Sequence, residues 1–234
     1  MKNILFTLAL LISFSSFGQT AEEYFKRAFS KASVNDDYGA ISDFNKAIEL
    51  NPNYGNAYFN RGNSKRILKD NYGAISDYTK AIELDPNFAD AYNNRGNSKG
   101  KLKDYNGAIS DYNKAIELNP NDSAAYFYRG SIKTDLKDYG GAISDYTKAI
   151  ELDPNDSYVF GMRGISKKKL KDYYGAISDY TKAIELNPND ANAYVNRGIS
   201  KEILGDLNGA CADWKKAAEL GDTDAAGWVA NQCN

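Results

Sequence analysis

Two kinds of charged residue recur in this chain at a constant interval of 34 positions. An arginine and an aspartate lie 16 positions apart in each of six successive copies. The arginines are Arg27, Arg61, Arg95, Arg129, Arg163 and Arg197, and the aspartates are Asp43, Asp77, Asp111, Asp145, Asp179 and Asp213. If the chain reverses midway, near Asn35 in the first copy, the two residues lie at the same height and form an ion pair. A ladder of free arginines that binds anions is the alternative, and the facing carboxylates disfavour it.

The residue types that most catalytic and metal sites require are scarce. The chain has no histidine and two cysteines. Ser-His-Asp and Cys-His nucleophiles, zinc sites with histidine and four-cysteine sites are therefore excluded. The glycines fall at repeat positions and form no phosphate-binding cluster after a strand. We expect no enzyme, no cofactor and no metal site.

The elements that hold the charged residues follow from the same interval. Five prolines are also spaced 34 residues apart, which indicates a stack of repeated units. They are Pro52, Pro86, Pro120, Pro154 and Pro188. Over residues 91–99 and 108–118, apolar and small residues recur every three or four positions, which is the period of a helix face. Pro120 ends the second helix, because proline lacks a backbone N–H and disfavours a helical residue before it. Each unit is predicted to be a helical hairpin.

The units resemble the tetratricopeptide repeat family. The family pattern is an aromatic residue, glycine, alanine, a second aromatic residue, alanine and proline. In the second unit these are Tyr58, Gly62, Ala74, Tyr78, Ala81 and Pro86. The resemblance covers units one to six, which are residues 21–54, 55–88, 89–122, 123–156, 157–190 and 191–224.

The resemblance implies an all-α fold, a right-handed α-solenoid or superhelix of six helical hairpins. The tail, residues 225–234, carries Trp228 where each unit has its first aromatic residue. We therefore expect a C-terminal capping helix that covers the last apolar face of the stack. In that position Trp228 would pack against the helix that contains Trp214.

The first 18 residues differ from the repeats. They contain one lysine, an apolar run over residues 4–12, and the sequence Ser16-Phe17-Gly18 before Gln19. This pattern is typical of a secretory signal peptide cleaved before Gln19, and the run is shorter than the ~20 residues that span a bilayer. We expect an exported protein, periplasmic or secreted, with no membrane span after cleavage. A retained signal anchor is the alternative.

The charge of the chain is nearly balanced. It has 29 lysines and arginines and 31 aspartates and glutamates, a formal net charge of −2. Nucleic-acid binding depends on a basic surface, so we expect no nucleic-acid partner. The resemblance implies instead a non-enzymatic protein–protein interaction scaffold whose partner is a protein or peptide.

In this family the concave groove is lined mainly by the first helices, where the residues of this chain vary between units. The resemblance places ten residues there: Phe59, Asn60, Asn63, Asn93, Asn94, Asn97, Phe127, Tyr128, Met162 and Asn196. Asparagine both donates and accepts hydrogen bonds, so an amide-rich groove can hold the backbone of an extended peptide while apolar pockets add selectivity. The groove is similar to the asparagine-lined superhelix of O-linked N-acetylglucosamine transferases. A merely solvated face is the alternative.

Other functions remain open at this point. Phe25 and Phe29 would give the first helix an uncapped apolar face that joins copies end to end, which makes a structural, self-assembling envelope protein an alternative with weak self-association. An accessory subunit of an exported enzyme complex is another. Residues 167–171 contain four lysines, which predict a solvated turn or a contact with an acidic partner.

The two cysteines are predicted to form a disulfide. An exported chain meets an oxidising compartment, and the number of cysteines is even. Cys211 and Cys233 are each 11 positions from Asp222, so they lie at the same height if the chain reverses there. Free cysteine as a small core residue is the alternative.

The glycine of the family pattern lies in the first helix of a unit. Another glycine recurs inside the second helix of every unit, and in unit three it is Gly107. Glycine costs roughly 1 kcal/mol relative to alanine in a helix. The sequence offers no physical reason for its presence at this position.

Overall fold

The computed structural model describes residues 19–233. Within that range it consists of thirteen α-helices without a strand. The predicted signal peptide, residues 1–18, lies outside the described residues. Across residues 19–233, no helix is both long enough and apolar enough to cross a membrane.

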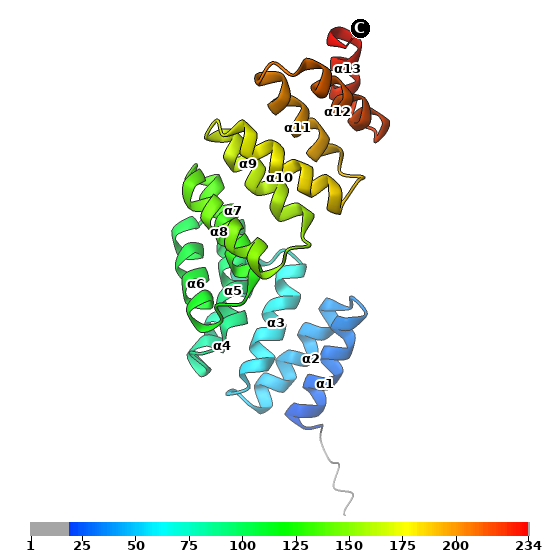
Figure 1. Ribbon diagram of the computed structural model, residues 1–234. Helices are drawn as coiled ribbons and strands as arrows, with labels where there is room; N and C mark the ends of the chain where they lie inside the picture. The colour runs from blue at the N-terminus through cyan, green and yellow to red at the C-terminus, as the bar shows by residue number, and fades with distance from the viewer. Residues whose placement is uncertain (1–18, 234) are drawn as a thin grey trace, which may run out of the picture.

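The helices form successive hairpins. The first helices of units one to six are α1 (Ala21–Ser33), α3 (Gly55–Ile67), α5 (Ala89–Lys101), α7 (Ser123–Asp135), α9 (Ser157–Lys169) and α11 (Ala191–Ile203). The second helices are α2 (Asp37–Leu50), α4 (Asn71–Leu84), α6 (Tyr105–Leu118), α8 (Tyr139–Leu152), α10 (Tyr173–Leu186) and α12 (Leu207–Glu219), and α13 (Thr223–Gln232) follows. Figure 1 shows the hairpins stacked along a curved path from α1 to α13. The predicted all-α solenoid with a C-terminal capping helix is confirmed.

The glycine inside each second helix accompanies the residue that caps that helix. Asp104 precedes α6, and its carboxylate Oδ1 accepts the backbone N–H of Gly107 at 3.0 Å. This bond satisfies one of the free N–H groups at a helix start. A Cβ at position 107 would clash with the Asp104 carboxylate. Glycine therefore leaves room for the cap, which sequence analysis did not explain.

Small residues and aromatic rings form the core between helices. Gly96 of α5 lies against the Tyr112 ring of α6, and a Cβ there would come within 2.9 Å of the ring. Ala108 is fully buried, and Ala115 and Tyr112 are each 1% exposed. The small residues of the repeat thus let the helices approach closely.

The predicted ion pairs are confirmed in all six units. In unit three, Arg95 Nε donates to Asp111 Oδ2 at 2.9 Å and Arg95 Nη2 donates to Asp111 Oδ1 at 2.7 Å. The carboxylate is 3% exposed, and Lys99 Nζ approaches its Oδ2 at 2.8 Å. Each aspartate therefore neutralises two cations, and the lysine was not anticipated from the sequence.

Each arginine of units two to six also reaches the preceding unit. Arg95 Nη1 donates to Thr79 Oγ1 at 3.1 Å, across 16 residues. Equivalent bonds join Arg61 to Asn45, Arg129 to Asn113, Arg163 to Thr147 and Arg197 to Thr181. The ion pair within a unit and the bond between units therefore share one guanidinium.

In unit one the ion pair lowers the pKa of the aspartate carboxyl. The Arg27 guanidinium hydrogen-bonds Asp43 and lowers the pKa of that carboxyl to about 2, against an opposing effect of burial. A carboxyl whose pKa is lower in the folded than in the unfolded state stabilises the fold at pH values above its ordinary pKa of 3.8. This contribution is lost as the pH falls through about 2.

The C-terminal cap is fastened in two ways. Cys211 of α12 and Cys233 form a disulfide. The Trp214 and Trp228 rings lie 5.3 Å apart between centroids, and Ala225 of α13 is fully buried beneath them. The helix α13 therefore covers the end of the stack, as expected.

The N-terminal face differs from the sequence expectation. Phe25 is half-buried and packs against Phe44 and Tyr54, with ring centroids 5.7 Å and 4.9 Å away. Phe29 alone of the predicted pair is exposed, at 57%. The prediction of an apolar end face built from both rings is wrong for Phe25, because its ring packs against aromatic residues of its own unit.

Candidate functional site

A series of cavities follows the first helices. The largest has a volume of about 540 Å³ and touches α3, α5 and α7 through Arg66, Asn97 and Tyr128. Others of about 280 Å³ and 200 Å³ adjoin it at Tyr128. A fourth, of about 310 Å³, lies between α9 and α11. The first helices thus contribute to the lining of each of these cavities.

The asparagines of units two and three form a connected amide network. Asn63 Oδ1 accepts from the Tyr78 hydroxyl at 2.8 Å and from Asn94 Nδ2 at 2.9 Å. Asn97 Oδ1 accepts from the Tyr112 hydroxyl at 2.9 Å. Within residues 19–233, the Nδ2 groups of Asn63 and Asn97 and the Oδ1 of Asn94 make no hydrogen bond. Tyr78 and Tyr112 therefore orient Asn63 and Asn97, while two donor groups and one acceptor of the network remain unbonded.

Two further predicted asparagines are held by their own helices. Asn60 Nδ2 donates to the Asn56 carbonyl, and Asn196 Nδ2 donates to the Asn192 carbonyl, each at 2.8 Å. Asn196 Oδ1 accepts from Lys168 Nζ at 2.6 Å. Asn60 thus presents its carbonyl oxygen, whereas both polar atoms of Asn196 are already bonded.

The prediction that Asn93 lines the groove is wrong. Asn93 is 9% exposed, and its Nδ2 donates to Asp122 Oδ2 at 3.1 Å. It stands at the unit position of Phe59, whose ring packs against Tyr78 and Phe88 with centroids 5.9 Å and 4.6 Å away. This helix position faces the residue that caps the next first helix, so Phe59 also contributes mainly to packing.

The aromatic residues predicted in unit four lie at the centre of the cavities. Tyr128 is 37% exposed, and its ring stacks on Tyr112 with centroids 6.2 Å apart. Phe127 lies beside it and packs against Tyr146 and Tyr158, at 5.9 Å and 5.7 Å. Tyr128 is therefore the more exposed of the two rings, and Phe127 packs against its edge.

Sequence analysis missed a group of cations in the largest cavity. Arg66, Lys69 and Lys101 line it and form no ion pair within residues 19–233. Arg66 and Lys101 come from the last turns of α3 and α5, so only their placement on neighbouring helices brings them together. The cavity is consequently electropositive and suits an acidic group.

The basic run at residues 167–171 is only partly a solvated turn. Lys167 Nζ pairs with Asp179 Oδ2 at 2.8 Å. Lys168 is half-buried, and burial together with the neighbouring Lys169 lowers its pKa. Lys169 and Lys171 are exposed, as expected.

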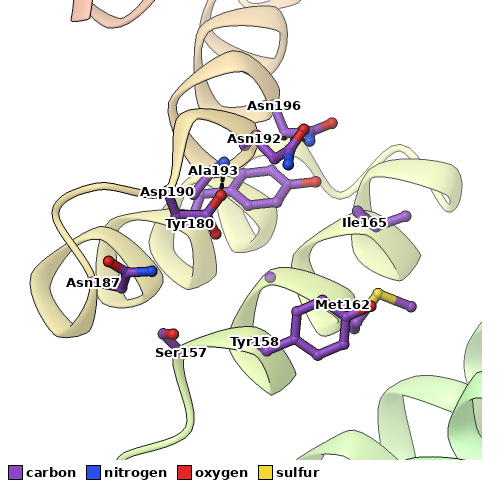
Figure 2. A pocket seen from close by; sticks show the side chains of 11 residues that line it. Ser157, Tyr158, Met162, Ile165, Tyr180, Asn187, Asp190, Asn192, Ala193 and Asn196 are labelled. Carbon is purple, nitrogen blue, oxygen red and sulfur yellow. Dashed lines mark hydrogen bonds between the residues drawn. The ribbon is translucent and has the colours of Figure 1, made fainter. Parts of the chain in front are cut away.

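The cavity between α9 and α11 is termed the Gly161 pocket (Figure 2). Its lining includes the predicted Met162 and Asn196, together with Tyr158, Gly161, Ile165 and Tyr180. Figure 2 shows Tyr180 next to Asn192 and Asn196, across from Tyr158, Met162 and Ile165. The pocket thus has one polar side and one apolar side.

Comparisons with known proteins agree with this arrangement. A profile of the tetratricopeptide repeat matches residues 89–122 and 123–156, and a second TPR repeat profile matches residues 62–103 and 166–201. The chain belongs to the tetratricopeptide repeat family. Its fold is that of a protein–protein interaction scaffold, and proteins of this family are generally non-enzymatic.

Solved structures of the same fold include three informative ones. MamA is 27% identical, with 70% of this chain and 96% of that chain covered at a TM-score of 0.66. YrrB, described as a TPR protein with an unusual peptide-binding site, is 25% identical over 80% of this chain and 97% of its own, with a TM-score of 0.70. PilF of Pseudomonas aeruginosa is similar in fold alone. It is 19% identical over 90% of this chain and 97% of its own, with a TM-score of 0.76. The comparison with curated protein sequences gives no match.

Proposed function

We propose that this protein binds an extended peptide or protein segment along the first helices of units two to six. The carrying observation is the amide network, because Asn63, Asn94 and Asn97 keep unbonded Nδ2 or Oδ1 atoms and Asn97 lines two of the cavities. Backbone N–H and C=O groups of an extended segment need such partners. The peptide-binding site named for YrrB supports this proposal.

The charges in the largest cavity narrow the class of partner. Arg66, Lys69 and Lys101 have no carboxylate paired with them in the described part of the chain. A carboxylate of the bound segment would form charge-assisted hydrogen bonds with them. We therefore propose a segment that places an acidic side chain beside Tyr128.

Replacing Asn60 and Asn94 together by alanine should weaken peptide binding. A peptide selected from a displayed random library against the full chain serves as the ligand. Loss of two hydrogen bonds of about 1 kcal/mol each predicts at least a roughly tenfold weaker affinity. Isothermal titration calorimetry measures the affinity, and circular dichroism confirms that the helices persist.

Asn106 and Asn208 give a matched control for this double variant. Both are exposed on second helices, away from the cavities. Their replacement by alanine should leave the affinity unchanged. If Asn60→Ala with Asn94→Ala binds as the unaltered chain does, the segment binds elsewhere. If that variant loses helicity, the two amides are structural.

We also propose that the protein is exported. The leader pattern of residues 1–18 and the disulfide between Cys211 and Cys233 support this, because structural disulfides persist mainly in oxidising compartments. Amino-terminal sequencing of the native protein should begin at Gln19. An amino terminus at Met1 on all of the native protein would contradict cleavage.

A further inference from the structure

The Gly161 pocket occupies the place where other units hold a phenylalanine ring. Three units carry phenylalanine at the position of Gly161, namely Phe25, Phe59 and Phe127. The unit-four ring packs against Tyr146 of its own unit and Tyr158 of the next, at 5.9 Å and 5.7 Å. Tyr180 is the unit-five equivalent of Tyr146. A Cβ added to Gly161 would meet no atom within 4 Å, so the space beside Tyr180 is open.

A buried polar atom faces this space without a partner. Tyr180 is 1% exposed, and its hydroxyl makes no hydrogen bond within residues 19–233. The equivalent hydroxyl of Tyr112 donates to Asn97, whose position in unit five is taken by Ile165. Burial raises the pKa of Tyr180, so its hydroxyl keeps the proton and can donate. A buried donor without a partner destabilises the fold, and an acceptor on a ligand would remove this penalty.

The rest of the wall suits a flat ring beside a peptide backbone. Met162 and Tyr158 lie opposite Tyr180 (Figure 2), and thioether and aromatic groups both pack favourably on aromatic rings. Asn192 lines the polar side, and its side-chain amide makes no hydrogen bond in the described range. The volume of about 310 Å³ exceeds the ~150 Å³ cavity that accommodates benzene. The excess leaves room for the backbone that carries the ring.

We propose that the Gly161 pocket binds an aromatic side chain, of phenylalanine or tyrosine, supplied by the bound segment. The ring takes the place that phenylalanine fills in units one, two and four, and the Tyr180 hydroxyl donates to a backbone carbonyl beside it. The inference deepens the proposed function and rests on it for the source of the ring. It makes the groove selective for segments with an aromatic residue near the unit-five end.

Methionine labelling gives a direct test, because the chain contains two methionines and Met162 lines the pocket. The full chain is labelled with ¹³C at the methionine methyls and titrated with N-acetyl-phenylalanine-N-methylamide. The Met162 signal, assigned by its loss in Met162→Leu, should shift saturably. The alanine counterpart of this probe should cause no saturable shift. Absence of a shift with the phenylalanine amide would overturn the proposal.

Filling the pocket should abolish the shift of the Met162 signal that the phenylalanine amide causes. Gly161→Phe supplies the ring that other units carry, so we expect the probe to bind at least tenfold more weakly while the thermal midpoint stays the same or rises. Gly140→Phe is the matched control, since Gly140 also has no atom within 4 Å of an added Cβ but lies on α8, outside the pocket. Equal loss of binding in both variants would contradict the assignment.

Tyr180→Phe tests the hydroxyl independently if Gly161→Phe fails to fold. We expect about a threefold to tenfold weaker probe affinity without a lower thermal midpoint, because the lost hydroxyl has no partner in the free protein. Tyr112→Phe should lower the midpoint, because it loses the bond to Asn97. Unchanged probe affinity in Tyr180→Phe would remove the hydroxyl from the proposal.

The outcomes separate this inference from the proposed function. The probe needs only the pocket, so Asn60→Ala with Asn94→Ala should leave the Met162 shift intact. A Met162 shift without any peptide binding would support the pocket and count against the groove. Peptide binding without a Met162 shift would overturn the pocket alone.

Discussion

Replacing Asp111 by alanine is expected to destabilise the protein by about 3–5 kcal/mol, as the removal of one partner from a buried ion pair does. The carboxylate is 3% exposed and is bonded to Arg95 and Lys99, so its loss leaves two cations facing each other without an acceptor. The side chain of Arg95 is only 16% exposed, which prevents full rehydration. The midpoint of urea unfolding, followed by far-ultraviolet circular dichroism, measures the effect.

A double-mutant cycle isolates the pair. Arg95→Ala combined with Asp111→Ala should cost less than the sum of the single changes, because removing both partners leaves fewer unmatched charges. Glu117→Ala is the control: Glu117 pairs with Lys114 on the surface and its side chain is 67% exposed, so the change should stay within about 1 kcal/mol. Additive effects of Arg95 and Asp111 would show that the two residues do not act as a pair.

Reduction of the disulfide should loosen the C-terminal cap while the remaining units stay folded. A bridge that closes a loop across 22 residues stabilises by roughly 3 kcal/mol in the chain-entropy model. Both tryptophans of the protein lie in this region, Trp214 on α12 and Trp228 on α13. Tryptophan fluorescence therefore reports on the cap, and circular dichroism reports on all helices. In the variant Cys211→Ser with Cys233→Ser, fluorescence should change at a lower urea concentration than ellipticity does.

Two observations would count against this expectation. Alkylation of the native protein without reductant should modify no cysteine, and two modified thiols would show that the bridge is not formed. Coincident fluorescence and ellipticity transitions at the original midpoint in the serine variant would show that the bridge contributes little. A single change such as Ala226→Ser, exposed on α13, serves as a control for serine in the cap.

The sequence predicts those features that depend on residues within one unit. The helices and the pairing of Arg95 with Asp111 follow from periodicity, because both residues lie equally far from one turn. The bond from Arg95 to Thr79 crosses between units and depends on how the hairpins stack. Adjacent residues of one helix can also have different roles. Asn93 and Asn94 are consecutive in sequence, yet only Asn94 joins the amide network, because successive side chains of a helix point in different directions.

The Gly161 pocket could not be predicted from the sequences of the units alone. Glycine in place of phenylalanine is visible in the sequence, but a neighbouring side chain could have filled the space. Asp190 and Asn192 border the pocket, whereas Phe88 holds the position of Asp190 in unit two and Tyr158 holds the position of Asn192 in unit five. At Gly161 the loss of the ring therefore coincides with the loss of its aromatic neighbours.

The guanidinium bond between consecutive units bears on how such a chain can change its length in evolution. Its acceptor is always an asparagine or threonine 16 residues earlier, as Asn113 is for Arg129. Duplication or deletion of one 34-residue segment, such as residues 89–122, would therefore bring another matching donor and acceptor together. Whole segments are interchangeable at their junctions, so copy number can vary while each new segment brings its own lining residues.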